Sequence, residues 1–171
     1  LEFNKTVEVL VLTPTRELAQ QVEKEFGRLG KFNRVKAVTV VGGQNGYHQV
    51  SDINRGCQVV VATPGRMLDH LKQGRLQNVT PKLLILDEPF QGVDIKARRD
   101  IGAHIRATSD NRATLVFVSE IDEAFEIADR ILVLHEQSIV GQHVNKNIDL
   151  AELLSQVSGN TESIEQAEMV R

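Results

Sequence analysis

The chain has 171 residues, of which 41% are hydrophobic and 25% charged, and its formal net charge is −3. This balance is typical of a globular protein large enough to bury a core. The single cysteine, Cys57, excludes an internal disulfide bond and suits a reducing compartment, and we interpret it as a buried spacer rather than a nucleophile. No apolar stretch reaches the roughly 20 residues that cross a bilayer, so we expect no membrane insertion.

Short β-rich apolar runs alternate with helical patterns along the chain. In chain order, the patterns predict a strand over residues 7–12, a helix over 16–29, a strand over 36–41, a helix over 47–54, a strand over 58–62, a helix over 66–73, a strand over 83–86, a helix over 94–108, a strand over 113–118, a helix over 121–128, strands over 131–134 and 138–144, and a helix over 150–157. The alternation predicts an α/β fold, a three-layer sandwich with a mostly parallel sheet. We expect one domain over residues 1–158 and a disordered tail over 159–171, where apolar residues are scarce.

Three sequence blocks follow the first three predicted strands. They are Pro-Thr-Arg-Glu-Leu-Ala at Pro14–Ala19, Gly42-Gly43, and Thr-Pro-Gly-Arg at Thr63–Arg66. With these blocks in this order, residues 6–88 resemble the first RecA-like domain of DEAD-box RNA helicases. The resemblance implies that the blocks touch the phosphates and sugars of single-stranded RNA, with Arg16 and Arg66 as the charges for phosphate. The RNA-binding candidates are Pro14, Thr15, Arg16, Glu17, Gly42, Gly43, Thr63, Pro64, Gly65 and Arg66.

A structural role is the alternative for the same residues. Thr15 and Thr63 stand where helix N-caps are expected, and Gly42 and Gly43 permit a turn. If RNA does bind, a few phosphate contacts predict weak binding that depends strongly on salt.

The fourth predicted strand ends in the sequence Leu-Ile-Leu-Asp-Glu at Leu84–Glu88. DEAD-box helicases continue this motif with Ala-Asp, whereas this chain continues with Pro-Phe-Gln-Gly-Val-Asp at Pro89–Asp94. The continuation resembles the Walker B motif and D-loop of sugar-import ABC transporter ATPases, and residues 83–158 resemble the C-terminal part of such an ATP-binding subunit. We therefore interpret the chain as an engineered or recombined chimera, with a helicase-like half (1–88) and a transporter-like half (89–158).

ATP and magnesium are the cofactors of both resembled families. In both, the first acidic residue of the motif helps to hold magnesium and the second orients the attacking water. Asp87 and Glu88 are therefore vestigial catalytic candidates, and Asp87 is the vestigial magnesium candidate. The phosphate-cradling pattern Gly-x4-Gly-Lys-Ser/Thr does not occur in the 171 residues.

These observations leave three hypotheses. The leading one is a P-loop-NTPase-derived domain without catalysis or bound cofactor. The alternatives are a residual RNA-binding module that uses Arg16 and Arg66, and a residual ATP-binding or ATPase domain. The five histidines do not cluster in the sequence, so we expect no metal site. Both resembled families suggest a cytoplasmic location.

The order of the strands in the sheet can also be predicted. The helicase resemblance implies the order 2-1-3-4 for the first four strands. We expect the fifth and sixth strands to pair directly, because a gap would leave backbone edges without partners. The result is the flavodoxin-like order 2-1-3-4-5-6. A free edge of this sheet is also a candidate surface for homodimerisation.

Overall fold

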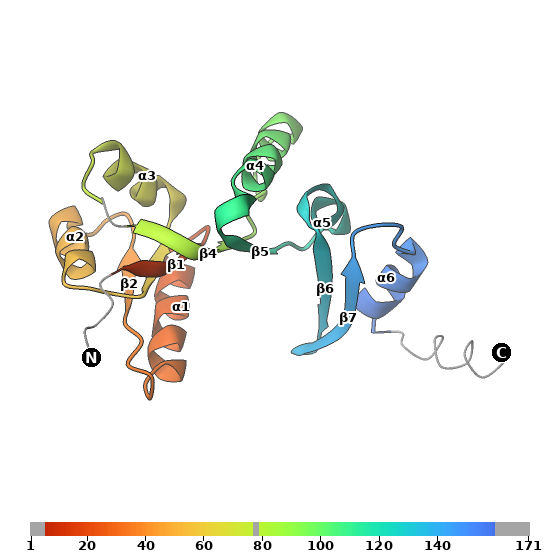
Figure 1. Ribbon diagram of the computed structural model, residues 1–171, viewed down its shortest axis with the longest axis horizontal. Helices are drawn as coiled ribbons and strands as arrows, with labels where there is room; N and C mark the ends of the chain where they lie inside the picture. Colours follow the sequence, from red (N-terminus) through yellow and green to blue (C-terminus); the bar gives the residue numbers. More distant parts are fainter. Residues whose placement is uncertain (1–5, 77–78, 160–171) are drawn as a thin grey trace. The chain divides into compact units, whose positions relative to one another are not determined.

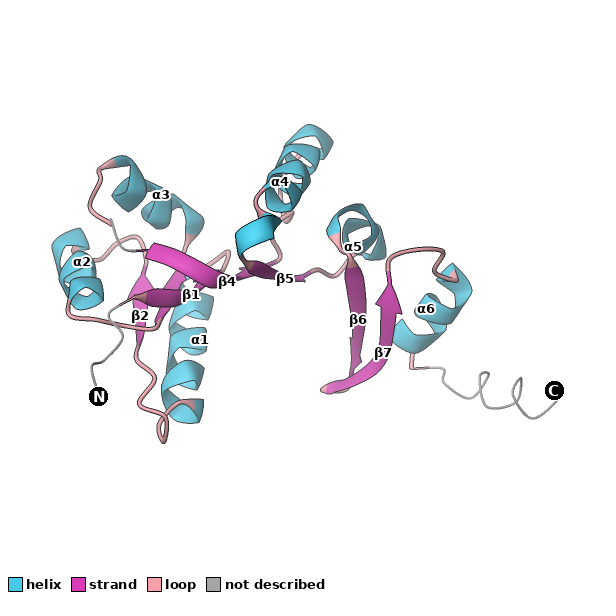
Figure 2. Ribbon diagram, in the orientation of Figure 1, coloured by secondary structure: helices cyan, strands magenta, loops and turns pink. Residues whose placement is uncertain are grey.

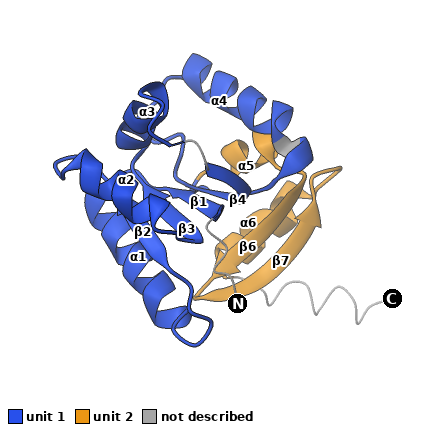
Figure 3. Ribbon diagram, turned by 60° about the vertical axis from the view of Figure 1, so that its left-hand side comes forward, with its two compact units in different colours: residues 1–119 blue, residues 120–171 orange. Residues whose placement is uncertain are grey.

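The computed structural model describes residues 6–76 and 79–159 of the chain (Figure 1). Contacts divide the chain into two compact units, Leu1–Ser119 and Glu120–Arg171, which Figure 3 colours separately. One domain over residues 1–158 stays a prediction. Of the tail expected at 159–171, all but Gly159 lies outside the described residues.

Every predicted helix and strand is present in the structure (Figure 2). The first unit contains β1 (Val7–Leu12), α1 (Arg16–Leu29), β2 (Ala37–Val40), α2 (Gly46–Asn54), β3 (Val59–Ala62), α3 (Pro64–Lys72), β4 (Val79–Asp87), α4 (Ile95–Ala107), a short 3₁₀ helix (Ser109–Asn111) and β5 (Ala113–Phe117). The second unit contains α5 (Ile121–Ile127), β6 (Arg130–His135), β7 (Ser138–Val144) and α6 (Leu150–Val157). The largest difference in bounds is in β4, which begins at Val79 rather than at residue 83.

The first unit is built on a parallel sheet of five strands in the order β2-β3-β1-β4-β5. The predicted order 2-1-3-4 is therefore wrong, because β3 lies between β1 and β2. All four residues of β3 are buried, whereas β2 alternates between buried and half-buried residues. A strand that is apolar at every position is favoured inside a sheet with both faces covered, and both orders place β3 inside and β2 at an edge. They differ in whether β1 or β3 pairs with β2, and the structure pairs β3 with it.

Helices cover both faces of this sheet, so the expected three-layer α/β architecture is confirmed. On one face, Ala19, Val22 and Phe26 of α1 pack against residues of β1 and β3. On the other face, residues of α2, α3 and α4 pack against alternate residues of the same strands and of β4. Cys57 lies in this second layer with no exposed surface, and burial raises the pKa of its thiol above the ordinary value, as expected for a structural cysteine.

The second unit is a two-stranded antiparallel sheet covered by α5 and α6. Its core is formed by Ile131 and Val133 of β6 and by Leu153 of α6. The predicted pairing of the fifth and sixth strands is wrong, because β6 pairs with β7 in a sheet of its own. The connecting residues Glu136 and Gln137 have φ angles of 45° and 67°. Positive φ at both central residues is what a tight hairpin requires, and such a short loop closes at little cost in chain entropy.

The sheet core predicts a clear stability difference between two valine truncations. Val60 has no exposed surface, whereas Val93 is 39% exposed. We expect Val60→Ala to lower the free energy of unfolding by about 2 to 3 kcal/mol, because methyl groups are lost from water-excluded packing and a cavity is left. Val93→Ala is the matched control and is expected to change it by less than about 1 kcal/mol. Equal losses in urea denaturation would contradict this assignment of the core.

Candidate nucleic-acid interface

The carboxyl ends of three neighbouring strands lie side by side. Ala62 at the end of β3 is in register with Leu12 of β1 and with Val40 of β2. Backbone bonds continue just beyond the strands: the Thr13 N–H donates to the Ala62 carbonyl at 3.0 Å, and the Thr63 N–H donates to the Val40 carbonyl at 3.1 Å. The three loops that follow therefore start next to each other at the carboxyl edge, where parallel α/β sheets place their ligands.

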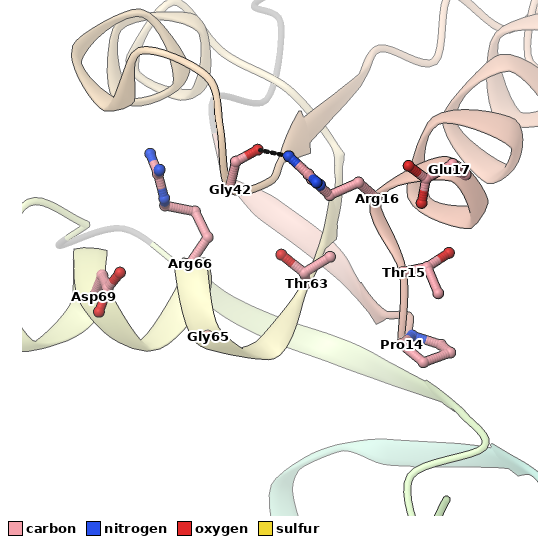
Figure 4. A pocket seen from close by; sticks show the side chains of 9 residues that line it. All are labelled: Pro14, Thr15, Arg16, Glu17, Gly42, Thr63, Gly65, Arg66 and Asp69. Atoms are coloured by element: carbon pink, nitrogen blue, oxygen red, sulfur yellow. Dashed lines mark hydrogen bonds between the residues drawn. The ribbon is translucent and has the colours of Figure 1, made fainter.

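These loops surround a hollow of about 430 Å³ (Figure 4). It is lined by Pro14, Thr15, Arg16, Glu17, Gly42, Thr63, Gly65, Arg66 and Asp69. The structure thus brings eight of the ten predicted RNA-binding residues to one surface, and the remaining two, Gly43 and Pro64, adjoin it in the chain. Sequence reasoning missed Asp69, which stands three residues after Arg66 on α3. The i,i+3 spacing on a helix was the available signal.

Arg16 enters the hollow from the first residue of α1 (Figure 4). The Thr15 side chain caps this helix by accepting a bond from the Leu18 N–H at 3.2 Å, which confirms the predicted capping role. One guanidinium nitrogen of Arg16 donates to the Gly42 carbonyl at 3.5 Å. Gly43 has a φ of 77°, and a Cβ atom there would lie 2.5 Å from the same nitrogen. Glycine at this position therefore permits both the turn and the approach of Arg16.

Arg66 reaches the same loop from the first turn of α3. Its Nη1 donates to the Gln44 carbonyl at 3.0 Å. Thr63 holds the N-cap position of this helix, but its side chain makes no capping bond, unlike that of Thr15. A guanidinium carries five N–H donors, so each arginine retains donors for an anion such as phosphate after bonding one loop carbonyl.

Two buried polar side chains, Gln49 and His70, support the glycine-rich loop between Gly42 and Gly46. The Gln49 amide nitrogen donates to the Val41 carbonyl at 2.8 Å and to the Gln44 side-chain oxygen at 3.4 Å. Its amide oxygen lies 3.1 Å from His70 Nε2. Because an amide oxygen only accepts, this arrangement places the proton of the imidazole on Nε2. Gln49 and His70 thus link α2 and α3 to the loop between Gly42 and Gly46.

His70 is held in its neutral form. Its side chain is 1% exposed, and its Nδ1 has no hydrogen-bond partner within the described residues. Burial lowers the pKa of His70, and the neighbouring charges of Arg66 and Arg75 lower it further, while Asp69 acts in the opposite direction. Protonation would place a third positive charge beside these two arginines.

A second group of polar residues lies at the ends of β4 and β5. Asp87 is the last residue of β4, and burial, followed by the charge of Glu88, raises the pKa of its carboxyl. Glu88 has a φ of 46°, its N–H donates to the Phe117 carbonyl at 3.0 Å, and its carboxylate accepts a bond from the Ser119 hydroxyl. The Ser119 contact was not predicted from the sequence. A carboxylate whose charged form is disfavoured by the fold is typical of a functional site.

Magnesium binds proteins through one or two carboxylates together with water and substrate phosphates, and Asp87 fits such a partial ligand set. Within residues 6–76 and 79–159, no cluster of three or more His, Cys, Asp or Glu side chains is arranged to hold a metal ion. Among the helices of the same ranges, none has the length and apolar character needed to span a bilayer.

The fold and the loop-lined edge define a RecA-like helicase domain, and comparison with known proteins agrees. Residues 2–119 match the sequence family described as DEAD/DEAH box helicase, and the chain belongs to this family. It is 41% identical over 133 residues to the DEAD-box ATP-dependent RNA helicase RhpA of Helicobacter pylori, covering 77% of this chain and 27% of that protein. It is 32% identical over 123 residues to the ATP-dependent RNA helicase DbpA of Bacillus subtilis, covering 72% and 26%. The chain therefore spans about a quarter of the length of these relatives.

Solved structures give the same result. A DEAD box protein from Methanococcus jannaschii is 34% identical with a TM-score of 0.56, and the match covers 69% of this chain and 32% of that one. A hypothetical ATP-dependent RNA helicase from Sulfolobus tokodaii is 29% identical with a TM-score of 0.56, covering 71% and 38%.

The family match corrects the interpretation of the chain as an engineered or recombined chimera. The match runs through Leu84–Glu88, where a change of family was expected, and continues to residue 119. The compact first unit also ends at Ser119, and its strands β4 and β5 pair in one continuous sheet. The Leu-Asp-Glu strand end is common to both resembled families, so that motif alone gave no basis for a boundary. The comparisons give no support for a transporter-derived part.

The neutral state of His70 predicts a pH-dependent stability. Its pKa is lower in the folded than in the unfolded chain, so protons bind preferentially to the unfolded state as the pH falls through about 6.5. We expect the stability advantage of the wild type over His70→Leu to shrink between pH 7.5 and pH 5.5, by about 1.4 kcal/mol for each unit of pKa difference. His48→Leu, at an exposed position, is the matched control for urea denaturation. An advantage that is constant over this range would contradict a buried neutral His70.

The raised pKa of Asp87 predicts that this residue destabilises the fold less as the pH falls, which is opposite to the trend expected for His70. Its pKa is raised in the folded state, so its ionised form at neutral pH costs folding free energy, and that cost disappears below the ordinary carboxyl pKa of about 4. We expect Asp87→Asn to raise the thermal midpoint at pH 7 and to lose this gain as the pH falls towards 4. Asp100→Asn, on the exposed surface of α4, should show no such trend. A lower midpoint for Asp87→Asn at pH 7 would rule out the assigned cost.

Proposed function

We propose that this chain contributes RNA binding to an ATP-dependent RNA helicase, and that it holds the sugar-phosphate backbone of single-stranded RNA along the carboxyl edge of β1, β2 and β3. The observation that carries the proposal is the convergence of Arg16 and Arg66 on one hollow from two different helices. The family supports it, since RhpA and DbpA are both named ATP-dependent RNA helicases.

The electrostatics of the hollow favour modest, sequence-independent binding. The lining contains Arg16 and Arg66 together with Glu17 and Asp69, so the net charge of the lining is close to neutral. Contacts to phosphates fix the position of a strand without recognising its bases. Helix capping by Thr15 and RNA contact by Arg16 are compatible, because the cap uses the threonine hydroxyl and leaves the guanidinium free to approach phosphate.

The carboxylates at the end of β4 are the proposed ATP-side residues of the same helicase. Asp87 would help to hold magnesium, which neutralises phosphate charge when it is bound, and Glu88 would orient the attacking water. The bond from Ser119 fixes the Glu88 carboxylate to the end of β5. The 171 residues contain no Gly-x4-Gly-Lys-Ser/Thr sequence, so ATP hydrolysis is proposed for the longer helicase and not for this part alone.

Three expectations remain predictions. A homodimer through a sheet edge, a cytoplasmic location and the absence of a bound cofactor from the chain on its own are untested. The edge strand most suited to dimerisation is β5, which pairs on one side with β4 and has Leu115 and Phe117 39% and 42% exposed.

RNA binding is tested by the anisotropy of labelled oligouridine between about 50 mM and about 200 mM salt. We expect Arg16→Ala and Arg66→Ala each to weaken binding about tenfold or more, because each loses a charge-assisted hydrogen bond to phosphate. Each should also reduce the slope of log K against log salt by about 0.7. Arg28→Ala is the matched control, since Arg28 is exposed in the last turn of α1 and pairs with Glu25.

Two results would contradict the proposal. One is the absence of oligouridine binding by the wild type at the lowest salt concentration. The other is an equal loss of affinity in Arg28→Ala, which would show that only overall charge matters.

A further inference from the structure

Tyr47 is the only tyrosine of the chain, which also contains no tryptophan. It stands in the first turn of α2, just after the glycine-rich loop, and 78% of its surface is exposed. Its backbone is held in place, because its N–H donates to the side chain of the N-cap residue Asn45 at 2.9 Å. An aromatic ring gains free energy by burial, so a large ring that is left open on a fixed backbone suggests a ligand.

Arg75 lies against this ring. Its guanidinium carbon is 5.3 Å from the centre of the Tyr47 ring, within the range of a cation–π contact. The backbone of Arg75 is fixed beyond the end of α3, where its N–H donates to the His70 carbonyl at 3.0 Å. The ring is therefore supported by an arginine from a different element, although it remains exposed.

Gly46 connects Tyr47 and Arg75 to the hollow that Arg16 and Arg66 line. A Cβ atom on Gly46 would lie 3.3 Å from Nη1 of Arg66 and 3.6 Å from Nη1 of Arg75. Both guanidiniums thus converge on the residue that precedes Tyr47. Arg66 also lines the hollow, so Gly46, the residue before Tyr47, lies beside the proposed phosphate path.

We propose that Tyr47 and Arg75 form a stacking platform for a nucleobase of the single strand whose phosphates lie at Arg16 and Arg66. The inference rests on the proposed RNA binding. Unpaired bases stack on aromatic rings and on guanidinium planes, whereas phosphates alone do not use such a surface. Every base has a flat aromatic face, so the platform accepts any base and leaves binding sequence-tolerant.

Two other aromatic residues show what distinguishes this site. Arg98 makes a similar cation–π contact with Phe90, but Phe90 is 5% exposed and its contact therefore belongs to the packing of the domain. Phe32 is 93% exposed but lies beyond the far end of α1, whose 14 residues span about 21 Å from Arg16. Tyr47 combines an exposed ring, a cationic neighbour and proximity to the hollow.

The single tyrosine allows a direct test, because the intrinsic emission of the wild type reports on Tyr47 alone. We expect oligouridine to quench this emission with the same midpoint as the anisotropy of the labelled strand. Tyr47→Ala should weaken oligouridine binding about five- to hundredfold, whereas Tyr47→Trp should retain it. Phe32→Ala is the matched control and should bind like the wild type. An abasic sugar-phosphate oligomer should bind equally to the wild type and to Tyr47→Ala.

The outcomes separate the platform from the proposed function. If oligouridine binds and Arg16→Ala weakens it, but tyrosine emission and the affinity of Tyr47→Ala are unchanged, the platform is wrong and backbone binding stands. If Tyr47→Ala loses affinity for the abasic oligomer as strongly as for oligouridine, the ring affects binding of the sugar-phosphate backbone rather than of a base. The platform is then overturned as well. If the wild type binds no RNA, both proposals fail.

Discussion

The parallel register of β1, β2 and β3 is the constraint on which the candidate site depends. Leu12 and Val40 are both level with Ala62, and the backbone bonds continue one residue past the strands. Three loops that are far apart in the sequence therefore begin at the same height on one edge. A slip of one strand by a single residue would reverse the faces of its side chains and move its loop away from the other two. The valines buried inside the sheet hold this register.

Within that frame, a few polar contacts determine the shape of the edge. Arg16 and Arg66 donate to the carbonyls of Gly42 and Gln44 in the loop between Gly42 and Gly46, and Gln49 donates to the carbonyl of Val41 just before this loop. Hydrogen bonds of buried groups are costly to break, since a partner left behind is not solvated. Neutral His70 completes this arrangement without adding charge next to the arginines. The buried Gln49 bond therefore anchors the start of the loop, whereas the two arginine bonds lie at the exposed surface.

Sequence patterns predicted the elements and the positions of the three blocks, because strands, caps and glycine turns are local features. They did not predict that β3 lies between β1 and β2, because the expected order placed β1 beside β2. Strands over 131–134 and 138–144 were both predicted, but the first was expected to pair with β5. The turn at Glu136 and Gln137, which links β6 to β7, carries no glycine or asparagine signal for a hairpin. Gln49 and His70 were missed because a polar residue on a buried helix face is recognisable only when its partner is known. The boundary expected after Glu88 rested on a motif shared by two families, and the family match through residue 119 overturned it.

The carboxyl edge of the sheet is the surface that we propose holds the sugar-phosphate backbone of RNA. Amide chemical shifts of the labelled chain, followed by NMR during titration with single-stranded RNA, test it most directly. The account predicts that the shift changes concentrate in the loops after β1, β2 and β3, at residues 13–18, 41–47 and 63–66. Changes confined to the amino ends of these strands, or to residues 120–159, would contradict it.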